Sequence, residues 1–131
     1  MRFMLLQHYA PAENCGVPMD QWRPEDVQAH VAFQQALNAE LQASGELVDA
    51  QGLSAQAKTV TSTGTAPVIT DGPYPESKEL LAGYRLIDVD TPERALEIAA
   101  RASAAPGPDG APIGDHIEVR EVMGAPRPDD V

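Results

Sequence analysis

The sequence predicts one α+β domain with a small hydrophobic core. The chain has 131 residues, which is the length of a single domain. Runs typical of strands alternate with stretches of helical spacing, and 12 prolines and 10 glycines fall largely between them. We expect the domain to cover residues 1–123 and a flexible polar tail to follow over 124–131.

The first half of the chain contains one strand and one long helix. Phe3–Tyr9 begins with four apolar residues in a row, a pattern typical of a strand that is buried on both faces. The helix is predicted over Pro24–Ser44, because proline fits the first helical turn and Gly45 is a suitable C-terminal stop. Its apolar residues recur at helical spacing.

A second strand and a hairpin follow. Glu46–Gly52 is the strand candidate, and Lys58–Thr63 is rich in β-branched residues. Pro67–Thr70 returns after a Gly-containing turn, so we expect a β-hairpin that is added to the main sheet.

The second half repeats the strand and helix pattern. In Gly83–Val89, alternation places Tyr84, Leu86 and Asp88 on one face and Arg85, Ile87 and Val89 on the other. Thr91 and Pro92 begin a second helix, which ends before the Pro/Gly-rich loop 104–115. Ile117–Met123 is the last strand.

Without the hairpin, the element order is β-α-β-β-α-β, which is the ferredoxin-like plan. Two helices cover only one face of such a sheet, whereas the first strand is apolar on both faces. We therefore expect a homodimer in which two sheets face each other and form a dimeric α/β barrel.

Composition limits the class of partner. Twenty acidic and nine basic residues give a net charge of −11, which argues against binding to nucleic acid or to anionic lipid. No apolar run approaches the roughly 20 residues that span a bilayer. The single cysteine, Cys15, and the lack of a signal-peptide pattern favour a reduced, cytoplasmic protein. No nucleotide-binding or metal-binding motif occurs, so we expect no cofactor and no metal.

Several segments resemble one known family. Residues 71–79, Asp-Gly-Pro-Tyr-Pro-Glu-Ser-Lys-Glu, resemble the DGPF signature, with Tyr74 in place of phenylalanine. The opening segment 2–6, the strand 83–89 and the closing segment 117–120 are also similar to that family. The chain is identified as a member of the DGPF branch of the YCII-related proteins.

The resemblance implies a ferredoxin-like fold and a dimeric α/β barrel. It implies less about activity: the wider family is associated with chemistry through a histidine and an aspartate, and some relatives are lyase-like. The DGPF branch is often encoded beside alternative sigma factors, which implies a regulatory or accessory role. The family's histidine position falls on Gln34 of this chain, and His30 lies one helical turn earlier.

The DGPY segment is the first candidate site. Lys78 would bind an anionic group there, Asp71 or Glu79 would act as a base or orienting partner, and Tyr74 would line the same pocket. The alternative is a turn whose charged side chains pair with one another at the surface.

The histidines form the second candidate site. His8 ends the first strand and His116 begins the last, so both should lie at one end of the sheet. Asp88 is expected beside them, because it ends a central strand that we expect to run parallel to the first. Two imidazoles and a carboxylate suit either a transition metal or acid–base chemistry, and the lack of a close H-x-H or H-x-x-x-H spacing argues against the metal. Strand ends also gather polar residues without using them. Tyr84 either lines this pocket or only packs. His30 is either a catalyst or a half-buried residue of the helix.

Two functions follow from these observations. The first is a domain that binds a small anionic molecule in a pocket near the dimer interface, with acid–base chemistry of the lyase or isomerase kind. The second is a non-catalytic accessory protein that binds a transcription regulator through its acidic surface.

Overall fold

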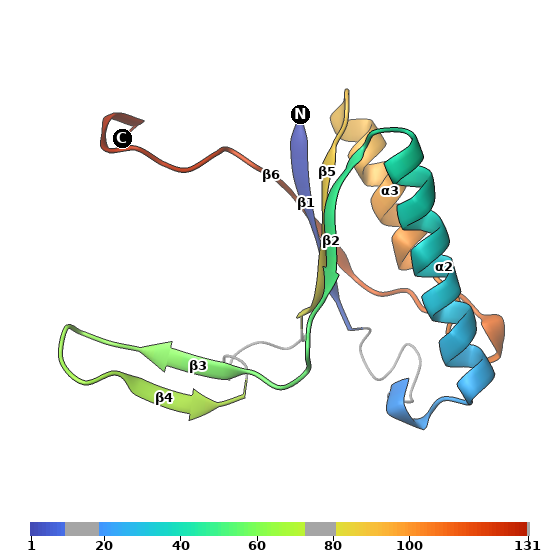
Figure 1. Ribbon diagram of the computed structural model, residues 1–131, viewed down its shortest axis with the longest axis horizontal. Coiled ribbons are helices and arrows are strands. Elements are labelled where there is room, and N and C mark those ends of the chain that lie inside the picture. The colour runs from blue at the N-terminus through green and yellow to red at the C-terminus, as the bar shows by residue number, and fades with distance from the viewer. Residues whose placement is uncertain (10–18, 73–80, 131) are drawn as a thin grey trace.

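The computed structural model of the protein describes residues 1–9, 19–72 and 81–130 (Figure 1). The described part contains six strands, two α-helices and three short 3-10 helices. In chain order they are β1 (Arg2–His8), η1 (Met19–Gln21), α2 (Pro24–Ala43), β2 (Leu47–Gly52), β3 (Lys58–Thr61), β4 (Val68–Asp71), β5 (Leu81–Asp88), α3 (Pro92–Ser103), η2 (Pro108–Gly110), β6 (Ile117–Glu121) and η3 (Pro128–Asp130). The predicted bounds agree with these to within a few residues.

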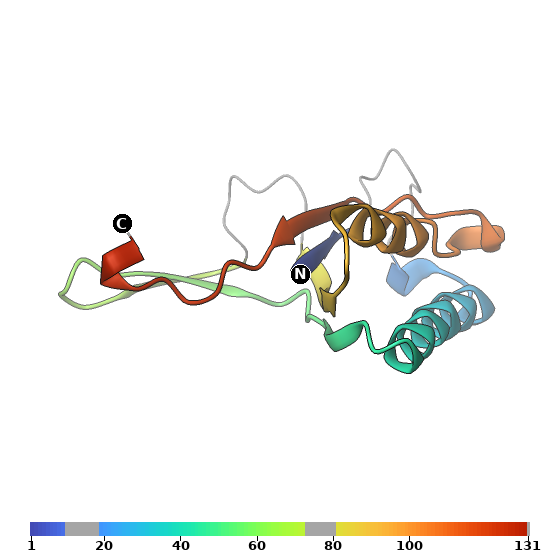
Figure 2. The same cartoon turned by 90° about the horizontal axis from the view of Figure 1, so that it is seen from above.

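Four strands form the main sheet, in the order β2-β5-β1-β6, and every neighbouring pair is antiparallel. Both α-helices lie on the same face of this sheet, and no helix of the described residues lies on the opposite face, which we call the uncovered face (Figures 1 and 2). The mixed α+β class that the sequence predicted is therefore confirmed.

The hairpin differs from the prediction. β3 and β4 pair only with each other, from Lys58 opposite Asp71 to Thr61 opposite Val68, and form a separate two-stranded sheet. Figure 1 shows this hairpin extending away from the uncovered face of the main sheet. The expectation that the hairpin adds to the main sheet was wrong, because the chain turns away after Gly52 and the two strands use their hydrogen bonds on one another.

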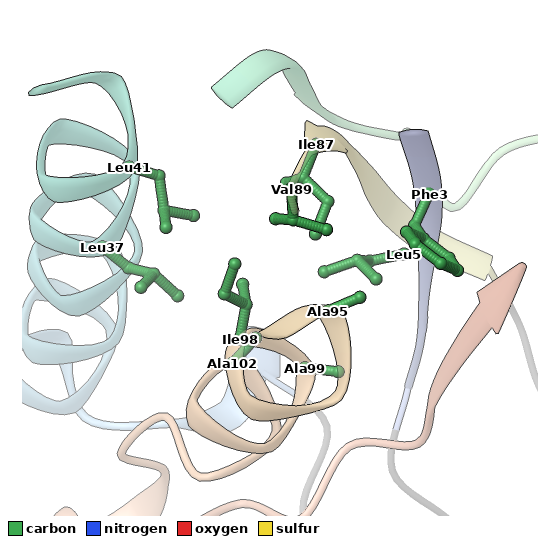
Figure 3. Packing of buried hydrophobic residues seen from close by; sticks show 10 residues of the cluster. All are labelled: Phe3, Leu5, Leu37, Leu41, Ile87, Val89, Ala95, Ile98, Ala99 and Ala102. Carbon is green, nitrogen blue, oxygen red and sulfur yellow. The ribbon is translucent and has the colours of Figure 1, made fainter. Parts of the chain in front are cut away.

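The hydrophobic core lies between the sheet and the two helices (Figure 3). Leu37 and Leu41 of α2 meet Ile98 of α3 over Ile87 of β5 and Leu5 of β1. The remaining members are Phe3, Val89, Ala95, Ala99 and Ala102. The alanines let α3 pack close to the sheet, because their methyl side chains take up little space between the two backbones.

The two α-helices begin at the residues that the sequence predicted, and α2 ends before the predicted glycine. The Thr91 hydroxyl caps α3 by accepting a hydrogen bond from the Arg94 amide at 3.2 Å. Pro24 begins α2, and Gly45 follows it with a positive φ of 80°. No helix of the described residues is long and apolar enough to cross a membrane.

Candidate functional site

A buried arginine lies between the sheet and the helices, beside the apolar core. Arg85 alternates onto the same face of β5 as Ile87, and only 6% of its surface is exposed. Its Nε donates to Asn38 Oδ1 of α2 at 2.7 Å, and its Nη1 lies 3.5 Å from Gln7 Oε1 of β1. Its Nη2 donates to Gln34 Oε1, one turn before Asn38. Side chains of two elements, α2 and β1, therefore hold the guanidinium group.

The charge of Arg85 has no counterion among residues 1–9, 19–72 and 81–130. Its three acceptors are neutral amide oxygens, and no carboxylate oxygen of these residues forms an ion pair with it. Burial lowers the pKa of the guanidinium below its ordinary value. A guanidinium has five N–H donors, so two of them have no acceptor in this part of the structure.

Gln7 extends the cluster towards a buried carboxylate. Its Oε1 faces Arg85, and its Nε2 donates to Asp115 Oδ2 at 3.0 Å. Asp115 is 4% exposed, and its backbone carbonyl accepts a 2.7 Å hydrogen bond from the Ser103 hydroxyl at the end of α3. The amide of Gln7 thus separates a positive group from a negative one.

His30 lies on α2, one turn before Gln34, and is 6% exposed. Its Nδ1 is 3.0 Å from the backbone carbonyl of Pro106, and Trp22 meets its ring edge to face with centroids 5.7 Å apart. A carbonyl only accepts hydrogen bonds, so Nδ1 carries the proton. In the neutral ring Nε2 is then bare, and Gln34 Nε2 lies 3.5 Å from it.

The loop after α3 presents the Pro106 carbonyl to His30. This loop folds back on itself through an isolated bridge between Pro106 and Pro112 and through a 2.8 Å hydrogen bond from the Ile113 amide to the Ala105 carbonyl. Ala105 and Ile113 pack against Trp22 in a small second apolar cluster. This loop is therefore packed against the rest of the domain.

An ion-pair group ties the same loop to the start of α2. Arg23 donates to Asp26 Oδ2 at 3.1 Å and to Asp109 Oδ1 at 3.0 Å. The hydrogen bond from Arg23 holds the pKa of Asp26 below its ordinary value. The carboxylate of Asp26 therefore stays charged and paired one turn before His30.

His8 and His116 lie at one end of the sheet, as predicted. The His8 amide donates to the His116 carbonyl at 2.9 Å across β1 and β6. The ring of His8 lies on the uncovered face, with Nε2 3.6 Å from Glu118 Oε1. Its Nδ1 is buried and has no hydrogen-bond partner among the residues that the structure describes.

The expected position of Asp88 was wrong. We expected β5 to run parallel to β1, but the two strands are antiparallel, with Arg2 opposite Asp88. Asp88 accordingly lies at the other end of the sheet, where its Oδ2 is 3.6 Å from Arg2 Nε. Arg2 and His8 are the first and last residues of β1, six residue steps apart, or about 20 Å of extended chain.

Tyr84 lies on the uncovered face of β5. Its hydroxyl donates to Asp49 Oδ2 of β2 at 2.7 Å. This hydrogen bond lowers the pKa of Asp49 and raises that of Tyr84. Tyr84 and Arg85 are neighbours in sequence, yet alternation directs them to opposite faces of the sheet, so they belong to different clusters.

The DGPY segment is described only at its first residues. Asp71 ends β4, is exposed, and pairs with Lys58 at 2.7 Å, which fits the surface-turn alternative for this residue. Tyr74, Lys78 and Glu79 lie outside the described residues, so their predicted roles stay predictions.

Sequence reasoning did not single out the polar cluster around Arg85. Its members in the structure are Gln7, His30, Gln34, Asn38, Arg85 and Asp115. A usable signal was present, because an arginine that alternates with Ile87 and Val89 on a central strand must be buried. Within residues 1–9, 19–72 and 81–130, no three His, Cys, Asp or Glu side chains lie close enough together to hold a metal ion.

The fold and the cluster define a class: an α+β domain whose helix-covered side contains both an apolar core and a buried cationic site. A family model for the YCII-related domain matches residues 1–124. The chain belongs to the YCII-related family. A search of the curated proteins found no match.

Proposed function

We propose that this protein binds a small anionic molecule, and that Arg85 recognises its carboxylate or similar anionic group. The observation that carries the proposal is the buried guanidinium, which has only neutral amide acceptors. Buried charges in proteins are normally paired, because removing an ion from water is costly. An anionic ligand would supply the missing charge.

The shape of the guanidinium also favours such a ligand. Arginine presents parallel N–H donors that form a bidentate contact with a carboxylate or phosphate group. Two N–H donors of Arg85 have no acceptor among the described residues, while the side-chain amides of Gln7 and Asn38 hold the group in place. A group held in this way loses little freedom on binding.

Thermal unfolding with two simple anions tests the proposal. Formate and sulfate, added at constant ionic strength against chloride, should raise the unfolding temperature of the wild-type protein. When the anion concentration is one hundred times the dissociation constant, the free energy of unfolding should rise by about 2.7 kcal/mol. Arg85→Met should remove this response.

The control variant is Arg101→Met. Arg101 is an arginine at the protein surface that pairs with Glu40, so its loss changes the net charge equally. It should leave the anion response unchanged. Equal responses of the wild type and Arg85→Met to both anions would overturn the proposal.

The same cluster supports acid–base chemistry of the lyase or isomerase kind, with His30 as the base. A bare imidazole nitrogen accepts a proton from a carbon atom beside a carboxylate, and the electron pair stays on the substrate. A cation such as Arg85 then stabilises the added negative charge. Malonate in D2O tests this step: wild-type protein should speed exchange of its methylene protons, and His30→Asn should not. If malonate exchanges with the wild-type protein only as fast as in buffer, the acid–base step is overturned and only the proposal of anion binding stands.

We also propose that the sheet's uncovered face binds a second copy, which gives the ferredoxin-like dimeric barrel. Met4, Leu6 and Leu86 are half-buried on this face, and within residues 1–9, 19–72 and 81–130 no helix covers it (Figure 1). The β3–β4 hairpin extends from the same side with Val60, Val68 and Ile69 exposed. A two-stranded hairpin is marginally stable alone, so a partner that covers it would stabilise it.

Sedimentation tests this association. Wild type should sediment at twice 14.0 kDa, and Leu86→Glu should shift it to the monomer. Leu96→Glu changes an exposed leucine of α3 and should remain dimeric. A 14.0 kDa wild-type particle at micromolar concentration would refute the dimer. The alternative role, as an accessory protein in sigma-factor-linked regulation, stays a prediction.

A further inference from the structure

Gln34 touches both of the groups that give the polar cluster its chemistry. Its Oε1 accepts a hydrogen bond from Arg85 Nη2, and its Nε2 lies 3.5 Å from His30 Nε2. An arginine has no acceptor atom, so the oxygen of the Gln34 amide must face it. Arg85 therefore fixes which end of the amide faces the histidine.

This orientation favours one protonation state of His30. The Pro106 carbonyl keeps the proton on Nδ1, and the Gln34 amino group faces the bare Nε2. If His30 gained a second proton, two N–H groups would face each other. The imidazolium then needs Gln34 to turn its amide by about half a turn, so that the oxygen faces His30.

Turning the amide changes Arg85 in the opposite way. The guanidinium loses its hydrogen bond to the Gln34 oxygen, so one more N–H group of Nη2 is left without an acceptor. An anion on Arg85 would satisfy that donor. A bound anion and a proton on His30 therefore favour the same position of Gln34.

We propose that Gln34 is a two-position relay that couples the binding of an anion at Arg85 to the uptake of a proton by His30. This inference rests on the proposed anion site. Gln34 is a positioning residue here, since it acts through its two neighbours. The coupling is reciprocal, so lower pH tightens anion binding and the anion favours the charged histidine.

Other charged groups surround His30 in the described part of the chain. Asp26 lies one turn earlier on α2 and is paired with Arg23, which also holds Asp109 of η2. On the side of the sheet are Arg85 of β5 and, beyond Gln7, the buried carboxylate of Asp115. The Trp22 edge and the Pro106 carbonyl are uncharged.

Isothermal titration of formate and sulfate between pH 5.5 and 8 tests the relay. Both anions keep their charge over this range, so any proton that is taken up comes to the protein. In two buffers of different ionisation enthalpy, wild type should show proton uptake on binding. Its affinity should rise as pH falls, by up to about tenfold per pH unit for one linked proton.

Four variants test whether His30 and Gln34 carry the effect. His30→Asn should bind the anion without proton uptake, whereas His8→Asn should retain it. Gln34→Leu should bind the anion with a much weaker pH dependence. Gln35→Leu changes the neighbouring, exposed glutamine of α2 and should behave like wild type. Nitrogen NMR of His30 should show a larger fraction of protonated Nε2 with the anion than without it, while Nδ1 stays protonated in both. The neutral fraction of the complex is the form that acts as the base.

The outcomes separate the relay from the anion site. If binding depends on Arg85 but Gln34→Leu keeps the wild-type pH dependence, the relay is overturned and the site stands. The same conclusion follows if the His30 nitrogen signals do not respond to the anion. If neither anion distinguishes wild type from Arg85→Met, the site itself is overturned and the relay with it.

Discussion

The space between the sheet and the helices has two ends that differ in chemistry although the same two elements form both. At one end, Leu41 of α2 packs over Ile87 of β5 in a fully apolar cluster. At the other end, Gln34 of α2 faces Arg85, only two residues before Ile87 on the same strand. The apolar end is complete by itself, whereas the polar end contains a charge that the described residues do not neutralise. We infer that the first stabilises the fold and the second is available for a ligand.

The largest expected effect is at the apolar end. Leu41 is completely buried, so Leu41→Ala leaves a cavity and should lower the free energy of unfolding by about 2–5 kcal/mol. Urea unfolding measures the change. Leu96→Ala is the matched control, because this leucine is exposed on α3 and should cost less than about 0.5 kcal/mol. Similar losses for both variants would contradict the assignment of the core.

A smaller effect is expected where β2 approaches β5 beside the polar end. A β-carbon on Gly83 would lie 2.6 Å from the Gln51 carbonyl oxygen, which is too close for any real contact. Gly83→Ala should therefore destabilise the protein by about 1–3 kcal/mol through overpacking, measured by urea unfolding. Gly52→Ala on β2 is the control, since no atom lies within 4 Å of its added carbon. A harmless Gly83→Ala would show that the two strands are further apart.

The ion pair that closes the apolar end predicts a pH dependence. Glu46 accepts hydrogen bonds from Arg94 Nε at 2.9 Å and Nη2 at 3.0 Å. Together with a hydrogen bond from the Ser44 hydroxyl, these lower the pKa of Glu46 from 4.5 to about 2. The pKa is lower in the folded state, so the stabilisation is present above pH 4.5 and is lost as pH falls towards 2.

Glu46→Gln should flatten this acid dependence and cost about 1 kcal/mol at neutral pH, as judged by urea unfolding at a series of pH values. Glu97→Gln is the control, because Glu97 pairs with the same arginine but is mostly exposed. An unchanged acid profile in Glu46→Gln would mean that other carboxylates set it.

The smallest change in stability is expected at the polar end. Without an anion, Arg85→Met should alter the free energy of unfolding by less than about 1 kcal/mol, because removal of a buried unpaired charge offsets the lost hydrogen bonds. Urea unfolding in chloride measures it. A loss of about 3–5 kcal/mol, typical of a broken buried ion pair, would show that the charge already has a partner.

The sequence predicts the elements well and the polar cluster poorly, for a physical reason. Alternation in 83–89 places Arg85 on the same side as Ile87, and that placement is confirmed. The acceptors of Arg85 come from β1 and from two turns of α2, and glutamine and asparagine are so common on surfaces that they give no signal. Asp88 was misplaced because spacing along the chain does not reveal strand direction, which depends on the connections across the whole sheet.

The partner of His30 Nδ1 is a backbone carbonyl and not a side chain. Every amino acid at position 106 carries that same oxygen, so point mutation there cannot delete the acceptor, and only a change in the path of the loop can move it. The tautomer of this histidine is thus built into the architecture of the main chain, and a protein engineer who wishes to invert it must rebuild the turn between Pro106 and Pro112.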